Sequence, residues 1–362
     1  MSPIPMRSLV RGFKPYTAGL SIDEIREKYG IERVIKLASN ENPLGTSPLV
    51  QHTLETHVGL AFRYPQAGNP RLVKAIAAHH GVSPSRVIVG DGSDEVIDLL
   101  FRICVEPGVN NAVAFMPCFG IYTTQAALCG VELRQTPVNA DFSFPWDNLL
   151  KLVDDKTSLV FVTTPDNPSG YTPPVAELET LAKALPDTCL LVLDEAYIDF
   201  ADGGGFLPRL GEFPNLIVLQ TLSKAWGMAG LRIGLAFAAR EVAALFSRVK
   251  YPYNIPGPTQ RVAEEMLGRD LAPQIAEIRS ERRRLASALA SCPCIERVYP
   301  SQTNFLLVRT PAPDALYDAL IEAGIIVRNR SRAAGCEGCL RLTVGTPAEN
   351  DRLLRTVKTF RP

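Results

Sequence analysis

The stretch LQTLSKAWGMAGLRIG, residues 219 to 234, joins the end of an apolar run to a lysine, three glycines and an arginine. Lys224 stands just past the apolar residues 216–219, which are typical of a buried strand. A lysine at the mouth of a sheet can be desolvated, and its lowered pKa then suits Schiff-base chemistry. Ser223 and Arg232 supply hydroxyl and guanidinium donors that suit a phosphate. Most lysines are solvated surface charges, so the pattern needs support from the rest of the chain.

Two further strand-like runs end in polar residues. CLLVLDEAYIDF (189–200) runs into Asp194, and SLVFVTTPDNPSG (158–170) ends in a turn that contains Asn167. Continuous apolar runs of this kind fit strands buried on both faces of a parallel sheet, and open α/β sheets bind ligands at the carboxyl ends of their strands. A helix-capping aspartate is the ordinary alternative for Asp194.

A glycine-containing loop, GDGSDE (90–95), precedes a helix that we expect over residues 96–104. Helix N-termini present unpaired N–H groups and the positive end of the dipole, which favour a phosphate. An ordinary N-cap is the alternative. The alternation of strand-like and helical stretches predicts an α/β protein with a parallel sheet, and neither GxGxxG after the first strand nor GxxxxGK[ST] is present.

The three segments 158–170, 189–200 and 219–234 resemble signature segments of pyridoxal-phosphate (PLP) aminotransferases of fold type I, in matching order and spacing. Further segments resemble the histidinol-phosphate aminotransferase family: KLASNENPLGTSP (36–48), RYP (63–65), GDGSDEVID (90–98), YPYNIP (251–256), TNFLLVR (303–309), and GIIVR with LRLTVGT (324–346). The resemblance covers nearly the whole chain.

This resemblance implies an α/β fold with two domains. The larger is expected to contain a mostly parallel seven-stranded sheet and the smaller to be α+β. We expect an N-terminal arm and helix at 1–35 packing with the small domain, the PLP-binding domain at 36–250 and the small domain at 251–362. A helix expected at 21–29 carries its own signals, a Ser21–Glu24 capping box and Gly30 at its end.

The resemblance also implies a role for each site residue. Lys224 would carry PLP and move the substrate's α-proton, Asp194 would pair with the protonated pyridine nitrogen, and Tyr197 and Asn167 would bind the ring's phenolate oxygen. Phe119 would stack on the ring; the family usually has tyrosine there, and phenylalanine loses any hydroxyl contact. The remaining implied contacts are Ser93, Asp94 (by its backbone N–H), Ser223, Arg232 and Tyr64 of a partner subunit on the cofactor phosphate, and Tyr16, Asn40, Arg328 and Arg341 on the substrates.

The leading functional hypothesis is therefore transfer of an amino group between L-histidinol phosphate and 2-oxoglutarate or glutamate, by a homodimer with shared active sites. Three alternatives stay open. They are transamination of aromatic amino acids, a PLP-dependent decarboxylase or lyase acting on threonine phosphate, and a non-catalytic regulator with an aminotransferase fold. The regulator would normally need a fused DNA-binding domain, for which about twenty residues of leader leave no room.

The composition of the chain agrees with a globular enzyme. In its 362 residues, 38 basic side chains balance 38 acidic ones, so no nucleic-acid or anionic-membrane footprint is visible. No apolar run approaches the ~20 residues of a membrane span, and the N-terminus lacks an apolar signal region, which favours the cytoplasm. We expect the eight cysteines to be reduced thiols and no metal to be bound, although the pairs Cys292/Cys294 and Cys336/Cys339 leave a zinc site as an alternative. The run Arg282–Arg284 is expected on a solvated face.

Overall fold

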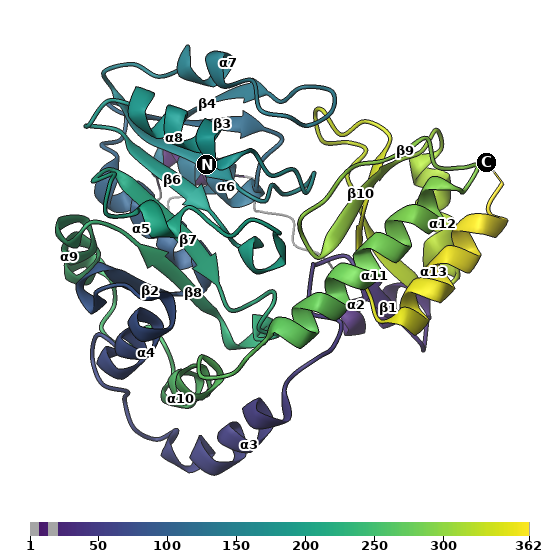
Figure 1. Ribbon diagram of the computed structural model, residues 1–362, viewed down its shortest axis with the longest axis horizontal. Helices are drawn as coiled ribbons and strands as arrows, with labels where there is room; N and C mark the ends of the chain where they lie inside the picture. Colours follow the sequence, from purple (N-terminus) through teal and green to yellow (C-terminus); the bar gives the residue numbers. More distant parts are fainter. Residues whose placement is uncertain (1–6, 14–20, 362) are drawn as a thin grey trace.

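The computed structural model describes residues 7–13 and 21–361, and these form two lobes, each around a β-sheet (Figure 1). The larger sheet has seven strands in the spatial order β2-β8-β7-β6-β5-β3-β4. All neighbours are parallel except β8, which is antiparallel to β2 and β7. This confirms the predicted sheet. Its strands are β2 (Val87–Asp91), β3 (Asn111–Met116), β4 (Glu132–Pro137), β5 (Thr157–Thr163), β6 (Leu190–Asp194), β7 (Leu216–Thr221) and β8 (Ile233–Phe237).

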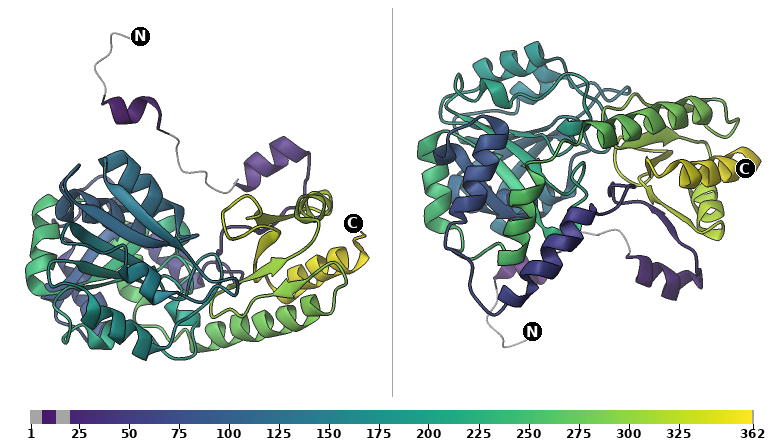
Figure 2. Two further views of the ribbon diagram at one scale, coloured as in Figure 1. Left: turned by 90° about the horizontal axis from the view of Figure 1, so that it is seen from above. Right: turned by 60° about the horizontal axis from the view of Figure 1, so that its bottom comes forward.

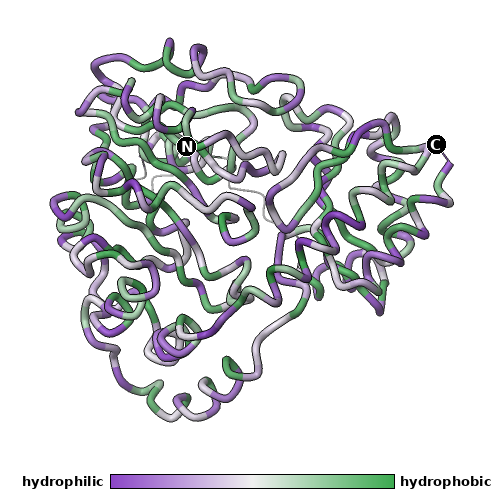
Figure 3. Tube along the Cα trace, viewed as in Figure 1, coloured by the Kyte–Doolittle hydropathy of each residue, from purple (hydrophilic) through white to green (hydrophobic). Residues whose placement is uncertain are grey.

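The central strands β5, β6 and β7 are buried on both faces, as their continuous apolar runs predict, and the hydrophobic segments of Figure 3 gather there. One face packs against α5, α6 and α9, and the other against α4, α7, α8 and α10. α3 and α4 both pack against α10. These helices are α3 (Pro48–His57), α4 (Pro70–His80), α5 (Gly92–Cys104), α6 (Gly120–Cys129), α7 (Trp146–Leu150), α8 (Val175–Ala184), α9 (Arg240–Val249) and α10 (Gly257–Met266).

The smaller sheet has five strands in the order β1-β11-β12-β10-β9. β1 is parallel to β11, and the other pairs are antiparallel. Its strands are β1 (Ile35–Leu37), β9 (Arg297–Val298), β10 (Phe305–Arg309), β11 (Ile325–Asn329) and β12 (Cys339–Thr343), and the accompanying helices are α2 (Ile22–Tyr29), α11 (Ala272–Ala290), α12 (Pro313–Glu322) and α13 (Pro347–Thr359). A short helix, α1 (Ser8–Arg11), lies beside α6. The capping box of α2 and its left-handed end at Gly30 are confirmed.

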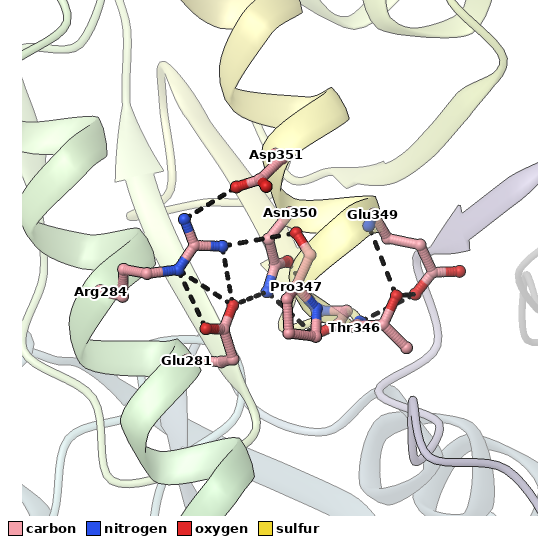
Figure 4. Close-up of polar contacts among 8 residues, drawn as sticks. Glu281, Arg284, Thr346, Pro347, Glu349, Asn350 and Asp351 are labelled. Carbon is pink, nitrogen blue, oxygen red and sulfur yellow. Dashed lines mark hydrogen bonds and ion pairs between the residues drawn. The ribbon is translucent and has the colours of Figure 1, made fainter.

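The long helix α11 runs between the two lobes, as the views in Figure 2 show. It contacts β10 in the small lobe and the turn at Ile198–Phe200 in the large one. Figure 4 shows how it is tied to α13: Arg284 forms an ion pair with Asp351, and Asn350 donates to Glu281. The capping box of Thr346 and Glu349 begins α13 beside these contacts.

The expectation that Arg282–Arg284 forms a solvated face is wrong for its first residue. Arg282 is buried, and its guanidinium donates to the carbonyl oxygens of Phe200 and Thr303. Arg283 and Arg284 are exposed. The buried guanidinium satisfies carbonyl groups that would otherwise lose their hydrogen bonds. The domain boundaries at residues 36 and 250 stay predictions.

Candidate active site

The predicted residues converge at the carboxyl edge of the large sheet. β5, β6 and β7 end there at Thr163, Asp194 and Thr221. A cavity of about 150 Å³ opens at this edge. Nine of the predicted residues line it: Ser93, Asp94, Phe119, Asn167, Asp194, Tyr197, Ser223, Lys224 and Arg232.

Lys224 follows β7 in the turn that leads to β8, so its side chain enters the cavity from the sheet edge. Its Nζ atom donates to the carbonyl oxygen of Ser39 at 3.3 Å and lies 5.7 Å from the centre of the Tyr197 ring. Burial, assisted by the nearby guanidinium of Arg341, lowers the pKa of Lys224 to about 8. The amine is therefore partly neutral near physiological pH, as a nucleophile or general base requires.

Asp194 ends β6 with a buried carboxylate. Its Oδ1 accepts the backbone N–H of Ala196 at 3.1 Å, and its Oδ2 accepts the hydroxyl of Tyr122 at 2.6 Å. Burial raises the pKa of Asp194, and the Tyr122 hydrogen bond opposes that rise. The next residue, Glu195, turns away from the cavity and accepts the backbone N–H of Phe206. Asp194 is thus the carboxylate that faces the cavity.

The hydroxyl oxygen of Tyr197 is held by two amides that come from different parts of the chain. Asn40 donates to it at 2.9 Å, and Asn167 donates at 3.4 Å. Arg341 of β12 in turn donates to Asn167 Oδ1 at 2.6 Å and to the Ala38 carbonyl at 2.8 Å. These bonds cross from the large sheet to the small one. Both lobes therefore build this side of the site.

Anion-binding groups gather at the N-terminus of α5. Ser93 and Asp94 lie in its first turn, where backbone N–H groups have no partner within the helix. Arg232 lies beside them, with Nη2 at 3.2 Å from Asp94 Oδ2. Ser223 accepts the hydroxyl of Thr221 at 2.9 Å on the same side. Such a set of N–H, hydroxyl and guanidinium donors suits a phosphate.

Four predicted residues do not line the cavity, and a fifth cannot be placed. Asn40 and Arg341 adjoin it through their bonds to Tyr197 and Asn167. Tyr64 is 83% exposed, stacks on Tyr253 with ring centres 4.9 Å apart, and lines a separate hollow of the surface. Arg328 of β11 is the direct cross-strand partner of Arg341, and neither lines the cavity. Tyr16 lies outside the described residues.

Comparisons with known proteins identify the family. A sequence profile described as "Aminotransferase class I and II" matches residues 32–357. The chain belongs to the class I and II aminotransferases. Proteins named histidinol-phosphate aminotransferase from Nitratidesulfovibrio vulgaris and Oleidesulfovibrio alaskensis are each 48% identical to it, over 99% and 98% of this chain and 97% and 94% of theirs.

A solved structure of similar shape belongs to the histidinol-phosphate aminotransferase of Sinorhizobium meliloti in complex with pyridoxal 5′-phosphate. It has a TM-score of 0.89 and 27% identity, covering 98% of this chain and 96% of that one. Class I and II aminotransferases use this cofactor, so the predicted cofactor is confirmed.

The site of this aminotransferase fits the cofactor's phosphate. A Cβ atom at Gly234 would lie 2.1 Å from the backbone nitrogen of Ser93, and one at Gly92 would lie 2.1 Å from Arg232 Nη2. Gly92 also has a φ of +70°, which glycine adopts without strain. Glycine at both positions lets the α5 N-terminus, β8 and the guanidinium approach one another. The close approach concentrates donors where a dianion would lie.

Sequence reasoning missed several residues of this aminotransferase site. Thr163 and Thr221 line the cavity, and each ends a buried strand, which is the signal that identified Asp194. Tyr122 carried no such signal, because its contact with Asp194 joins a helix to a strand 72 residues away. The cysteine pairs lie in two separate hydrophobic clusters, and no group able to hold a metal occurs among residues 7–13 and 21–361. Within the same residues, no helix combines the length and apolarity of a membrane span.

Proposed function

We propose that this aminotransferase transfers the amino group of L-histidinol phosphate to 2-oxoglutarate, which yields imidazole acetol phosphate and L-glutamate in histidine biosynthesis. The observation that carries the proposal is 48% identity to a histidinol-phosphate aminotransferase over 99% of this chain. The aromatic aminotransferase and threonine phosphate decarboxylase hypotheses serve as the alternatives in the test below.

Bound pyridoxal 5′-phosphate supplies an electron sink for the negative charge left when the substrate loses its α-proton. Lys224 would hold the cofactor and then move this proton, because a pKa near 8 places its amine close to neutral working pH. Asp194 lies at the buried end of its strand, and its carboxylate is held by hydrogen bonds from Ala196 and Tyr122. It would pair with a protonated ring nitrogen. A buried carboxylate is most stable when a cation faces it.

Tyr197 would donate a hydrogen bond into the cavity. Its oxygen already accepts from the amides of Asn40 and Asn167, so its own proton is left for a third acceptor. The ring's phenolate oxygen is the acceptor we propose. Phe119, which lines the cavity beside the start of α6, would pack against the cofactor ring. Ser93, Asp94, Ser223 and Arg232 would bind the cofactor phosphate.

The substrates would bind where Arg328 and Arg341 face each other. Directly opposed residues on antiparallel strands lie on one face of the sheet, so the two side chains bring positive charge to the same place. Both proposed substrates are anionic, one through its phosphate and the other through two carboxylates. Arg341 is 9% exposed, and burial strengthens its attraction for such an anion. Asn40 lies close by at the same lobe junction, and Tyr16 stays a prediction.

We further propose that two copies form a homodimer in which Tyr64 serves the partner's site. Large apolar side chains are exposed on the segment that carries it, namely Val58, Leu60 and Phe62. Tyr251 is exposed on the segment of Tyr253, on which Tyr64 stacks. Clustered exposed apolar residues favour association. Sedimentation equilibrium should give a mass about twice 39.5 kDa. An active species that sediments as a monomer would refute the shared site.

We also propose a cytoplasmic location. All eight cysteines are free thiols, and a reducing compartment keeps thiols in that state.

The substrate is tested by absorbance spectroscopy of the purified holoenzyme. Addition of L-histidinol phosphate should shift the cofactor's visible–near-ultraviolet band, and 2-oxoglutarate should restore it. A band that ignores L-histidinol phosphate but responds to phenylalanine or tyrosine would favour the aromatic alternative. Release of carbon dioxide from threonine phosphate would favour the decarboxylase. Lys224→Ala is the matched control, since its band should not cycle.

A further inference from the structure

Tyr122 makes the shortest contact to the Asp194 carboxylate. It lies in the first turn of α6, three residues after Phe119, and its hydroxyl donates to Asp194 Oδ2 at 2.6 Å. Tyr122 is 1% exposed and Asp194 is 3% exposed, so water does not compete for the bond. A hydroxyl that donates to an ionised carboxylate in such surroundings forms a strong, charge-assisted bond.

Thr163 extends this bond into a chain of hydroxyl groups. Its Oγ1 lies 3.1 Å from the Tyr122 hydroxyl oxygen, and Thr163 and Asp194 are register partners on β5 and β6. Tyr122 has one proton, and the charged carboxylate attracts it most strongly. Thr163 therefore donates to Tyr122, and Tyr122 donates to Asp194. Each bond in such a chain polarises the next.

Packing fixes the Tyr122 ring. It stacks on Phe161 of β5 with ring centres 4.5 Å apart and meets Phe119 edge-on at 5.8 Å. One side chain thus orients both the carboxylate and the aromatic ring that line the cavity. Removal of the hydroxyl alone would leave this packing in place, so the hydrogen bond can be tested separately from the ring.

We propose that Tyr122, supported by Thr163, is a positioning residue that keeps Asp194 ionised and aimed at the cofactor's ring nitrogen. A buried carboxylate resists ionisation, and the donated hydrogen bond counters that resistance. Without the bond, the proton shared by the ring nitrogen and Asp194 moves toward the carboxylate. The ring nitrogen then loses the charge that makes the ring an electron sink. The inference rests on the family's cofactor and not on the proposed substrate.

The test follows the protonation of the ring nitrogen in full-length holoenzyme reconstituted with ¹⁵N-labelled pyridoxal 5′-phosphate, without substrate. Tyr122→Phe should move the ¹⁵N resonance toward the unprotonated position. It should also weaken cofactor binding by roughly 10-fold to 100-fold, the worth of a hydrogen bond to a charged group. Thr163→Val should move the resonance in the same direction by less, and Thr163→Ser, which keeps the donor, should restore the wild-type value.

Tyr299→Phe is the matched control, because it removes a hydroxyl from another buried tyrosine. Tyr299 lies far from Tyr122 in the sequence and packs edge-on against Phe142. Its resonance and cofactor affinity should equal the wild-type values. An unchanged resonance in Tyr122→Phe overturns the inference, even if cofactor affinity or thermal stability falls, since those losses alone indicate a structural role. If Tyr122→Phe does not fold, the Thr163→Val and Thr163→Ser pair decides by the same criterion. Failure of L-histidinol phosphate as a substrate would leave this result unaffected.

Discussion

Gly234→Ala should weaken cofactor binding without removing any charged or hydrogen-bonding side chain from the site. A Cβ atom at position 234 would lie 2.1 Å from both the backbone carbon of Gly92 and the backbone nitrogen of Ser93. Ordinary contact begins near 3.4 Å, so β8 and the N-terminus of α5 must separate by about 1.3 Å. Neither neighbour is a flexible side chain. The displaced atoms are those proposed to bind the cofactor phosphate.

The expected losses of folding stability and of cofactor affinity can both be estimated. Overpacking a closely packed interface costs about 1–3 kcal/mol of folding free energy. Loss of one hydrogen bond to a charged phosphate costs about 1.5–3 kcal/mol of binding, so the cofactor's dissociation constant should rise roughly 10-fold to 100-fold. Equilibrium dialysis of the apo-protein against pyridoxal 5′-phosphate measures the constant, and thermal unfolding of the apo-protein measures stability.

Gly230→Ala is the matched control, because a Cβ atom there would meet nothing within 4 Å although the residue lies in the turn just before β8. It should bind the cofactor as tightly as the wild type. If Gly234→Ala also binds within twofold of the wild type, the α5 N-terminus does not hold the phosphate, and the assignment of Ser93 and Asp94 is refuted.

Three further predictions concern the lysine and the substrate arginine. Lys224→Ala should abolish turnover in a folded protein, which circular dichroism and steady-state assays can establish together; steady transamination by this variant would contradict its assignment. Because the folded pKa of Lys224 is about 8, below its ordinary value of 10.5, the neutral fraction of its amine rises with pH up to about 8. The rate of covalent cofactor capture by the apo-protein, followed by stopped-flow absorbance, should therefore increase about tenfold per pH unit below 8 and level off above it; a rate that keeps rising tenfold per pH unit up to pH 9.5 would exclude the shifted pKa. Arg341→Lys keeps the charge but loses the two-pronged guanidinium, so KM for 2-oxoglutarate should rise roughly 10-fold or more with little change in cofactor affinity, whereas exposed Arg355→Lys should change neither.

The sequence predicted the parts of the site that follow from strand endings. Asp194 and Lys224 could be placed together because parallel strands end at one edge of a sheet, and the structure has them in one cavity. The antiparallel strand β8 was not foreseen, since its apolar run, Ile233–Phe237, resembles that of a parallel strand. The N-terminal capping box of α2 was readable because all its contacts are local.

Contacts between distant segments could not be predicted in this way. Arg282 stands in a run of three arginines, but only one of the three points inward, and the carbonyl groups that it satisfies lie 82 and 21 residues away. The same holds for Tyr122, whose partner is fixed by how α6 packs on the sheet and not by any local pattern. Asn40 was noticed as a loop residue, whereas its left-handed backbone and its bond to Tyr197 depend on the meeting of two lobes.

The pairing of the first strand with a late one has a consequence for synthesis on the ribosome. Asn40 and its hydrogen-bond partner Thr343 are 303 residues apart. At about 5–20 residues per second, some 15–60 s pass between the emergence of the two residues. During that time the large lobe can fold, while the segment around β1 has no strand beside which to lie. Thr343 can hold Asn40 against Tyr197 only after the last strand has been made, so this side of the active site is assembled near the end of synthesis.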